Sequence, residues 1–161
     1  MNVIHHILRF AAAGLVLTLA ACGGGGGGDG DSAGGSTPTT GSVVGAAGGT
    51  VLGPNGAKVV IPAGALGADT VIAIEASTAG LPPLPGTFSA LGTMFELTPH
   101  GTRFAAPVSL TLPFDPASVP AGQTPALFKT NAQNQWEPVL GATFGTTSVT
   151  APVTSFSWVQ V

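Results

Sequence analysis

Short runs of alternating apolar and polar residues, each closed by glycine or proline, most restrict how this chain can fold. The run 108–112 reads Val-Ser-Leu-Thr-Leu, which would place Val108, Leu110 and Leu112 on one side of a strand and Ser109 and Thr111 on the other. Long helical periodicity is absent. The pattern predicts an all-β fold with a single antiparallel β-sandwich domain.

The same reasoning predicts where the other strands lie. Proline cannot donate to a ladder, so the proline-rich stretch 81–86 and the proline-marked stretch 115–125 are expected to be loops. The residues between 129 and 136 are expected to turn a hairpin. The expected strands are 49–52, 58–61, 70–76, 93–97, 108–112, 126–129, 136–140, 148–150 and 156–161.

The first 21 residues have the organisation of a secretory signal peptide. Residues 1–9 carry the positive charge of Arg9, and residues 10–21 form an apolar segment that ends in small residues. A membrane-spanning helix needs ~20 apolar residues, which is longer than this segment. We therefore expect residues 1–21 to be a signal peptide that is removed.

The segment Leu19-Ala20-Ala21-Cys22 resembles a bacterial lipobox. The resemblance implies cleavage between Ala21 and Cys22 and attachment of palmitate-type chains to the cysteine. Cys22 is the one cysteine of the chain, and a lone thiol suits an exported protein poorly unless it is modified. The alternative is an ordinary signal peptide that leaves a spare thiol. Gly23, by the Gram-negative sorting rule, favours the outer membrane.

Residues 22–42 are expected to be the lipidated cysteine and a flexible Gly/Ser/Thr linker, followed by the domain at 43–161. The segment begins with an unbroken glycine run and cannot bury enough apolar surface to order itself. About twenty such residues reach roughly 25 Å. Asp29-Gly30-Asp31 lacks the further ligands of a calcium loop, so it is interpreted as a hydrated part of the linker.

Several sequence blocks of the domain resemble the ZU-five family, which occurs in zonula occludens proteins, netrin receptors and ankyrins. The blocks are Gly-Gly-Thr-Val at 48–51, Val-Ile-Pro-Ala-Gly-Ala-Leu at 60–66, the segment 95–104 and the segment 107–113. The resemblance implies a β-sandwich and a structural or interaction module. It implies no shared substrate and no cofactor.

Side chains that could support catalysis are few. His100 is the one histidine after residue 6, so a metal site of histidine and cysteine is disfavoured and no metal is expected. A catalytic triad would have to use His100, which is expected in an exposed turn. The spacing of the acidic residues singles out no pair for glycosidase chemistry; these residues are Asp69, Glu75, Glu96, Asp115 and Glu137. We therefore predict that the protein is not an enzyme.

The aromatic and basic residues bear on the class of partner. Trp136 and Trp158 could stack on sugar rings, but a sandwich of this size also needs large aromatic residues in its core. The other candidate core aromatics are Phe88, Phe95, Phe104 and Phe128. The basic residues of the domain are Lys58, Arg103 and Lys129, too few for phosphate neutralisation, so nucleic acid is excluded as a partner.

The segment Ser155-Phe156-Ser157 resembles the His-Phe-Ser site at which some ZU-five domains cleave themselves. The resemblance implies that Ser157 occupies the nucleophile position and Ser155 the histidine position. A serine hydroxyl is far too weak to act as the general base, so the site is predicted to be inactive. We expect Phe156 and Trp158 to share one face of a final strand.

Together these features predict a lipid-anchored cell-envelope protein with a non-catalytic binding or structural module. Its partners would be the membrane, through the anchor, and an unknown envelope protein or glycan. The first alternative is a carbohydrate-binding module that uses an exposed tryptophan. The second is an envelope hydrolase.

Overall fold

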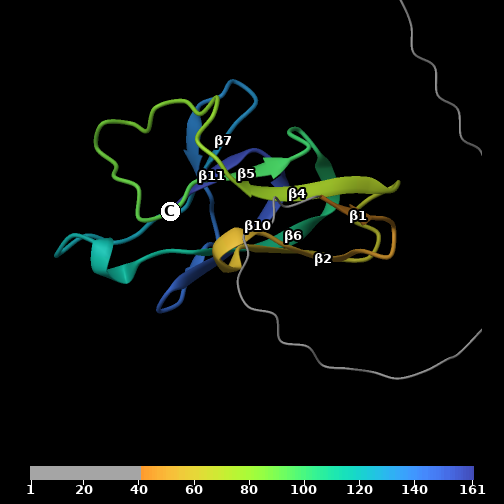
Figure 1. Cartoon of the computed structure of the whole chain (residues 1–161), viewed down its shortest axis with the longest axis horizontal. Coiled ribbons are helices and arrows are strands. Elements are labelled where there is room, and N and C mark those ends of the chain that lie inside the picture. The colour runs from red at the N-terminus through yellow and green to blue at the C-terminus, as the bar shows by residue number, and fades with distance from the viewer. Residues whose placement is uncertain (1–40) are drawn as a thin grey trace, which may run out of the picture. The chain divides into compact units, whose positions relative to one another are not determined.

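The computed structural model describes residues 41–161, which form a sandwich of two antiparallel sheets (Figure 1). The predicted signal peptide, Cys22 and the linker up to residue 40 lie outside the described residues. One sheet has the order β1(Ser42–Val44), β4(Thr70–Ala76), β5(Phe95–Thr98), β11(Trp158–Gln160), β7(Phe128–Thr130), β8(Trp136–Pro138). The other has the order β2(Gly49–Leu52), β3(Lys58–Ile61), β6(Arg103–Pro113), β10(Ser148–Ser155), β9(Thr143–Phe144). The predicted all-β sandwich is confirmed.

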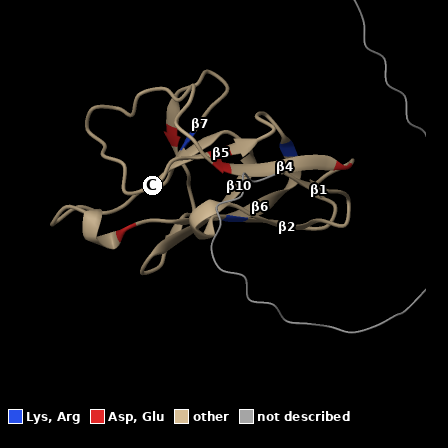
Figure 2. Cartoon of the chain, in the orientation of Figure 1, with Lys and Arg blue, Asp and Glu red and all other residues tan. Residues whose placement is uncertain are grey.

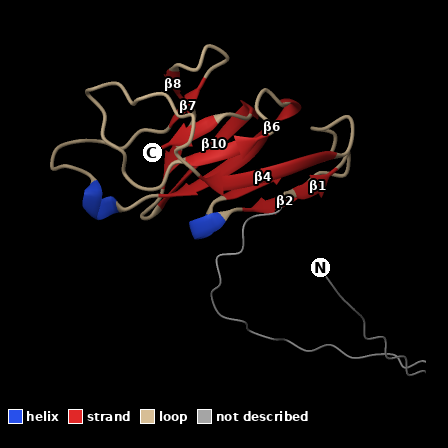
Figure 3. Ribbon diagram, turned by 45° about the horizontal axis from the view of Figure 1, so that its top comes forward, coloured by secondary structure: helices blue, strands red, loops and turns tan. Residues whose placement is uncertain are grey.

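Short helical turns and loops connect the strands outside the two sheets (Figure 3). The 3-10 turns η1 and η2 cover Pro54–Gly56 and Pro116–Ser118. In η2, Asp115 caps the turn because its carboxylate accepts from the Ala117 N–H at 2.9 Å. None of the helices within residues 41–161 is long and apolar enough to cross a membrane.

The predicted strands are present, some with different bounds: the strands predicted at 93–97 and 126–129 are β5 and β7, and the one predicted at 136–140 ends at Pro138. β2, β3 and β4 have the predicted bounds, whereas β6 and β10 extend well past 108–112 and 148–150. Pro152 pairs with Ser109 in the β6–β10 ladder. β9 pairs with β10 only at Val149 and Thr150, so Pro152 lies beyond that neighbour, where a missing N–H costs no ladder bond on that side. β1 and β9 were not predicted, and Ser42, assigned to the linker, lies in β1.

The core lies between the two sheets and follows the predicted alternation. Val108, Leu110 and Leu112 of β6 are fully buried, while Thr111 faces outward and its hydroxyl lies 3.2 Å from the Thr150 hydroxyl. Phe95 and Phe104 are buried as expected. The prediction was wrong for two other aromatics: Phe88 is 45% exposed and Phe128 is half-buried.

Those two residues instead attach the long loop of residues 77–94 to the outer face of the six-stranded sheet. The Phe88 and Phe128 rings lie 4.6 Å apart, the Trp136 indole donates to the Pro82 carbonyl at 3.1 Å, and the Leu91 N–H donates to Val161. The loop between β4 and β5 passes beside β7 (Figure 1). The proline-rich stretch thus covers part of the sheet that would otherwise face solvent.

The chain changes sheets between β10 and β11, and this crossover corrects the prediction of a single strand at 156–161. β10 ends at Ser155 in the five-stranded sheet, and β11 starts at Trp158 in the other. Phe156 is buried in the core, where its ring lies 4.7 Å from Phe104. Trp158 pairs with Glu96 and lies outside the core cluster. The two aromatic residues therefore do not share one strand face.

Candidate functional site

The segment Ser155-Phe156-Ser157 lines a pocket of about 610 Å³ at this crossover. The turn between β5 and β6 holds it through the backbone. The Gly101 N–H donates to the Phe156 carbonyl at 3.1 Å, and the Phe156 N–H donates to the Thr102 carbonyl at 3.3 Å. The structure therefore brings the predicted segment and the histidine-bearing turn into one site.

Self-cleavage would need a nucleophile, a hydrogen-bond donor for the oxyanion and a general base. The first two, the Ser157 hydroxyl and the Gly101 N–H, are present, but no general base contacts the Ser157 hydroxyl among the described residues. The Gly101 N–H already donates to the carbonyl that a Ser157 attack would convert to an oxyanion. The Ser157 hydroxyl, however, donates to the Trp158 carbonyl at 3.2 Å. The Ser155 hydroxyl accepts from the Lys129 ammonium at 3.2 Å, and a protonated amine cannot accept the serine proton.

His100 lines the same pocket but is held by other groups. Its Nε2 lies 3.2 Å from a Glu96 carboxylate oxygen, and its ring meets Trp158 edge-on at 5.7 Å. It sits in the turn that the sequence predicts, with 43% of its side chain exposed. Within residues 41–161, no group of three or more His, Cys, Asp or Glu residues is placed to hold a metal ion.

We expect the purified chain to remain uncut at the bond between Phe156 and Ser157. Losing general-base assistance typically slows such a step by about 10²–10⁴-fold. Intact-mass spectrometry after prolonged incubation should show one species, as it should for a Ser157→Ala control that has no nucleophile. Release of residues 157–161 from the wild type alone would contradict this prediction.

The lysine and the arginine that line the pocket differ in their partners: Lys129 forms an ion pair and Arg103 does not. Lys129 is 18% exposed and its ammonium lies 3.2 Å from a Glu137 carboxylate oxygen, so its charge is neutralised within the pocket. Arg103 is exposed and its backbone pairs with Ser155. Its guanidinium makes no ion pair or hydrogen bond with the described residues. Charged residues are sparse on the ribbon as a whole (Figure 2).

Neither tryptophan offers an open stacking platform. Trp158 is 5% exposed. Trp136 is half-buried, and its indole N–H is bonded to the Pro82 carbonyl. Both rings are packed, as a structural role requires, but on the outer face of the six-stranded sheet under a loop and a turn, rather than in the core between the sheets. The carbohydrate-binding alternative therefore loses the exposed tryptophan on which it depended.

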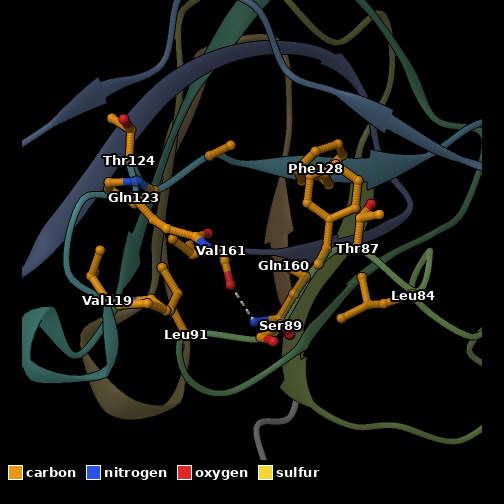
Figure 4. Close-up of a pocket in the computed structure, with 14 residues that line it drawn as sticks. Leu84, Thr87, Ser89, Leu91, Val119, Gln123, Thr124, Phe128, Gln160 and Val161 are labelled. Carbon is orange, nitrogen blue, oxygen red and sulfur yellow. Dashed lines mark hydrogen bonds between the residues drawn. The ribbon is translucent and has the colours of Figure 1, made fainter.

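A second, smaller pocket of about 190 Å³ lies beneath the loops that follow β4 and η2 (Figure 4). Gln160, which sequence reasoning missed, forms part of its wall and is 1% exposed. Its Nε2 donates to the main-chain oxygen of Val161 at 2.8 Å and to the Gly92 carbonyl at 3.4 Å. These two acceptors fix the orientation of the amide and leave Oε1 buried with no partner among the described residues.

The only local signal for Gln160 is its place in the apolar run Trp158-Val159-Gln160-Val161. The alternation of side chains along a strand predicts that Gln160 faces away from Val159, but it does not predict that a loop covers Gln160. The burial comes from residues 77–94, which are distant in the sequence. Gln160 is therefore an anchor for that loop.

Comparison with known proteins gives one family. A family model described as ZU5 domain matches residues 40–131, more than half of the 161-residue chain. The match runs from β1 through β7 and includes His100, Arg103 and Lys129. A search of curated proteins finds no match.

Proposed function

Because the chain belongs to the ZU5 domain family, we propose that it is a lipid-anchored cell-envelope protein whose sandwich binds another protein without catalysing a reaction. The family match carries the proposal, since ZU5 domains mediate protein–protein interaction. The pocket at the β10–β11 crossover is the candidate binding site. Its lining presents both polar and apolar atoms, and its one unpaired guanidinium, on Arg103, suits a partner's polar groups.

The anchor rests on the lipobox-like segment that ends at Cys22. Two or three acyl chains on one cysteine would hold the protein at the membrane, since each buried methylene contributes ~0.8 kcal/mol. Residues 22–42 would act as a spacer before the domain. Gly23 after the cysteine favours the outer membrane in a Gram-negative cell.

Replacing the predicted lipidation site tests the anchor. Cells that express the wild type should incorporate labelled palmitate into the protein, and cells that express Cys22→Ala should not, because the thiol is the acceptor. Ser36→Ala changes another small residue of the same segment and should keep the label. Equal labelling of wild type and Cys22→Ala would contradict the lipoprotein proposal.

The binding role is tested by recovering partners from envelope extracts with the full chain solubilised in detergent. A protein retained specifically, and lost when the extract is treated with protease beforehand, is the expected result. Retention of a glycan that survives protease treatment would favour the carbohydrate alternative and overturn the protein-binding role.

A further inference from the structure

Most of the basic side chains of the domain lie at one place. Lys58, Arg103 and Lys129 are the lysines and arginines of residues 41–161, and His100 is the histidine. Arg103, Lys129 and His100 all line the pocket at the β10–β11 crossover. Lys58 lies in β3, outside that lining. Two of the three lysines and arginines of the described chain thus line one pocket, together with the carboxylate of Glu137, although the whole chain has a formal net charge of −3.

Ser155 connects the two cations. Arg103 is its partner in the β6–β10 ladder, and residues directly opposite in a ladder project from the same face. The Lys129 ammonium lies 3.2 Å from the Ser155 hydroxyl. The backbone of Arg103 and the ammonium of Lys129 therefore both lie next to Ser155, whose hydroxyl can itself donate or accept a hydrogen bond.

The internal carboxylate of the pocket already has its partner. Glu137 lies 3.2 Å from Lys129 and Glu96 lies 3.2 Å from His100, so both nearby carboxylates face a partner other than Arg103, whose guanidinium has none among the described residues. An exposed guanidinium presents a planar fork of donors that matches a carboxylate with two parallel bonds. A volume of about 610 Å³ accommodates a short peptide segment rather than a single ion.

We propose that this pocket recognises a carboxylate of the partner protein, presented by an acidic side chain in an extended segment, with Arg103 as the anchoring residue. The inference rests on the proposed protein-binding function and names the chemistry of the partner. Lys129 and Glu137 set the strength of binding: Lys129 attracts the incoming carboxylate, and Glu137 opposes it.

The test measures peptide binding to the full chain in detergent by NMR. The chain has two arginines, Arg9 and Arg103, so the Nε–H signal of Arg103 can be assigned from its loss in Arg103→Gln. The probes are acetyl-Gly-Glu-Gly-Glu-Gly-amide and its counterpart with glutamine at both acidic positions. The acidic peptide should shift the Arg103 signal and bind about tenfold more tightly than the neutral peptide.

Three substitutions distinguish carboxylate binding through the charge of Arg103 from a loss of binding caused by a folding defect. Arg103→Gln should weaken binding of the acidic peptide about tenfold. Lys58→Gln, which removes the same charge outside the pocket, should change it by less than about twofold. Glu137→Gln should tighten binding about threefold, because it leaves Lys129 unneutralised. A folding defect would weaken binding in every variant, so the opposite signs are the diagnostic result.

Equal affinities for the two peptides, or equal losses in Arg103→Gln and Lys58→Gln, would overturn the inference. Displacement of the acidic peptide by inorganic phosphate at far lower concentration than by acetate would assign the pocket to phosphate groups instead. If Arg103→Gln still retains the envelope protein that the wild type recovers, the carboxylate site is wrong and the interaction function stands. Failure of the wild type to recover any protein removes the function itself.

Discussion

Gln160→Glu is expected to lower the free energy of unfolding by about 4 kcal/mol at pH 7, because it places an uncompensated charge at a buried position. The wild-type amide is 1% exposed and donates to the main-chain oxygens of Gly92 and Val161. An ionised carboxylate has no donor for those two main-chain oxygens, so oxygens that cannot bond one another would meet at a buried position.

The loss of stability in Gln160→Glu should become smaller as the pH falls. Burial among main-chain oxygens raises the pKa of the introduced carboxyl above its value in the unfolded chain, near 4.3. The folded state then binds more protons than the unfolded state, so the penalty is full above the folded pKa and decreases as the pH falls toward about 4. A protonated carboxyl also regains one donor.

Urea denaturation at pH 7 and pH 4 measures this effect. Gln133→Glu is the matched control, because Gln133 lies exposed in the turn between β7 and β8. It should change stability by no more than about 0.5 kcal/mol at either pH. If Gln160→Glu and Gln133→Glu unfold at the same urea concentration, the loop does not cover Gln160 as described.

Gly48→Ala should destabilise the domain by about 3 kcal/mol, combining backbone strain with steric overlap. Gly48 has φ +73° in the turn between β1 and β2. An added Cβ would overlap the Ile61 carbonyl oxygen and lie 2.7 Å from the Pro62 carbonyl carbon. Both are backbone atoms beside the Gly49–Ile61 pair of the β2–β3 ladder, so relief would require the strands to separate.

Gly56→Ala separates the two contributions. Gly56 has φ +83°, but an added Cβ would meet nothing within 4 Å. This substitution should therefore cost only the strain of a left-handed conformation, about 1 kcal/mol. The difference in unfolding free energy between Gly48→Ala and Gly56→Ala measures the overlap alone. Equal losses would show that the turn before β2 can open without disturbing the ladder.

The sequence by itself predicted the features that depend on neighbouring residues. The apolar alternation of β6, the bounds of β2, β3 and β4, and the hairpin between β7 and β8 all follow from period-two patterns and turn residues. The turn at His100 was predicted for the same reason. The resemblance to ZU-five domains rests on blocks of this local kind, and the family match confirms it.

Only the tertiary structure decided which sheet each strand joins and which residues a loop covers. Alternation assigns a side chain to one of two faces, but pairing between distant segments decides what lies against that face. It put Phe156 in the core and Trp158 outside it, brought Lys129 to Ser155 across 26 positions, and buried Gln160 against Gly92 across 68. Contacts at such separations leave no local pattern, which is why the pocket could not be assembled from the sequence.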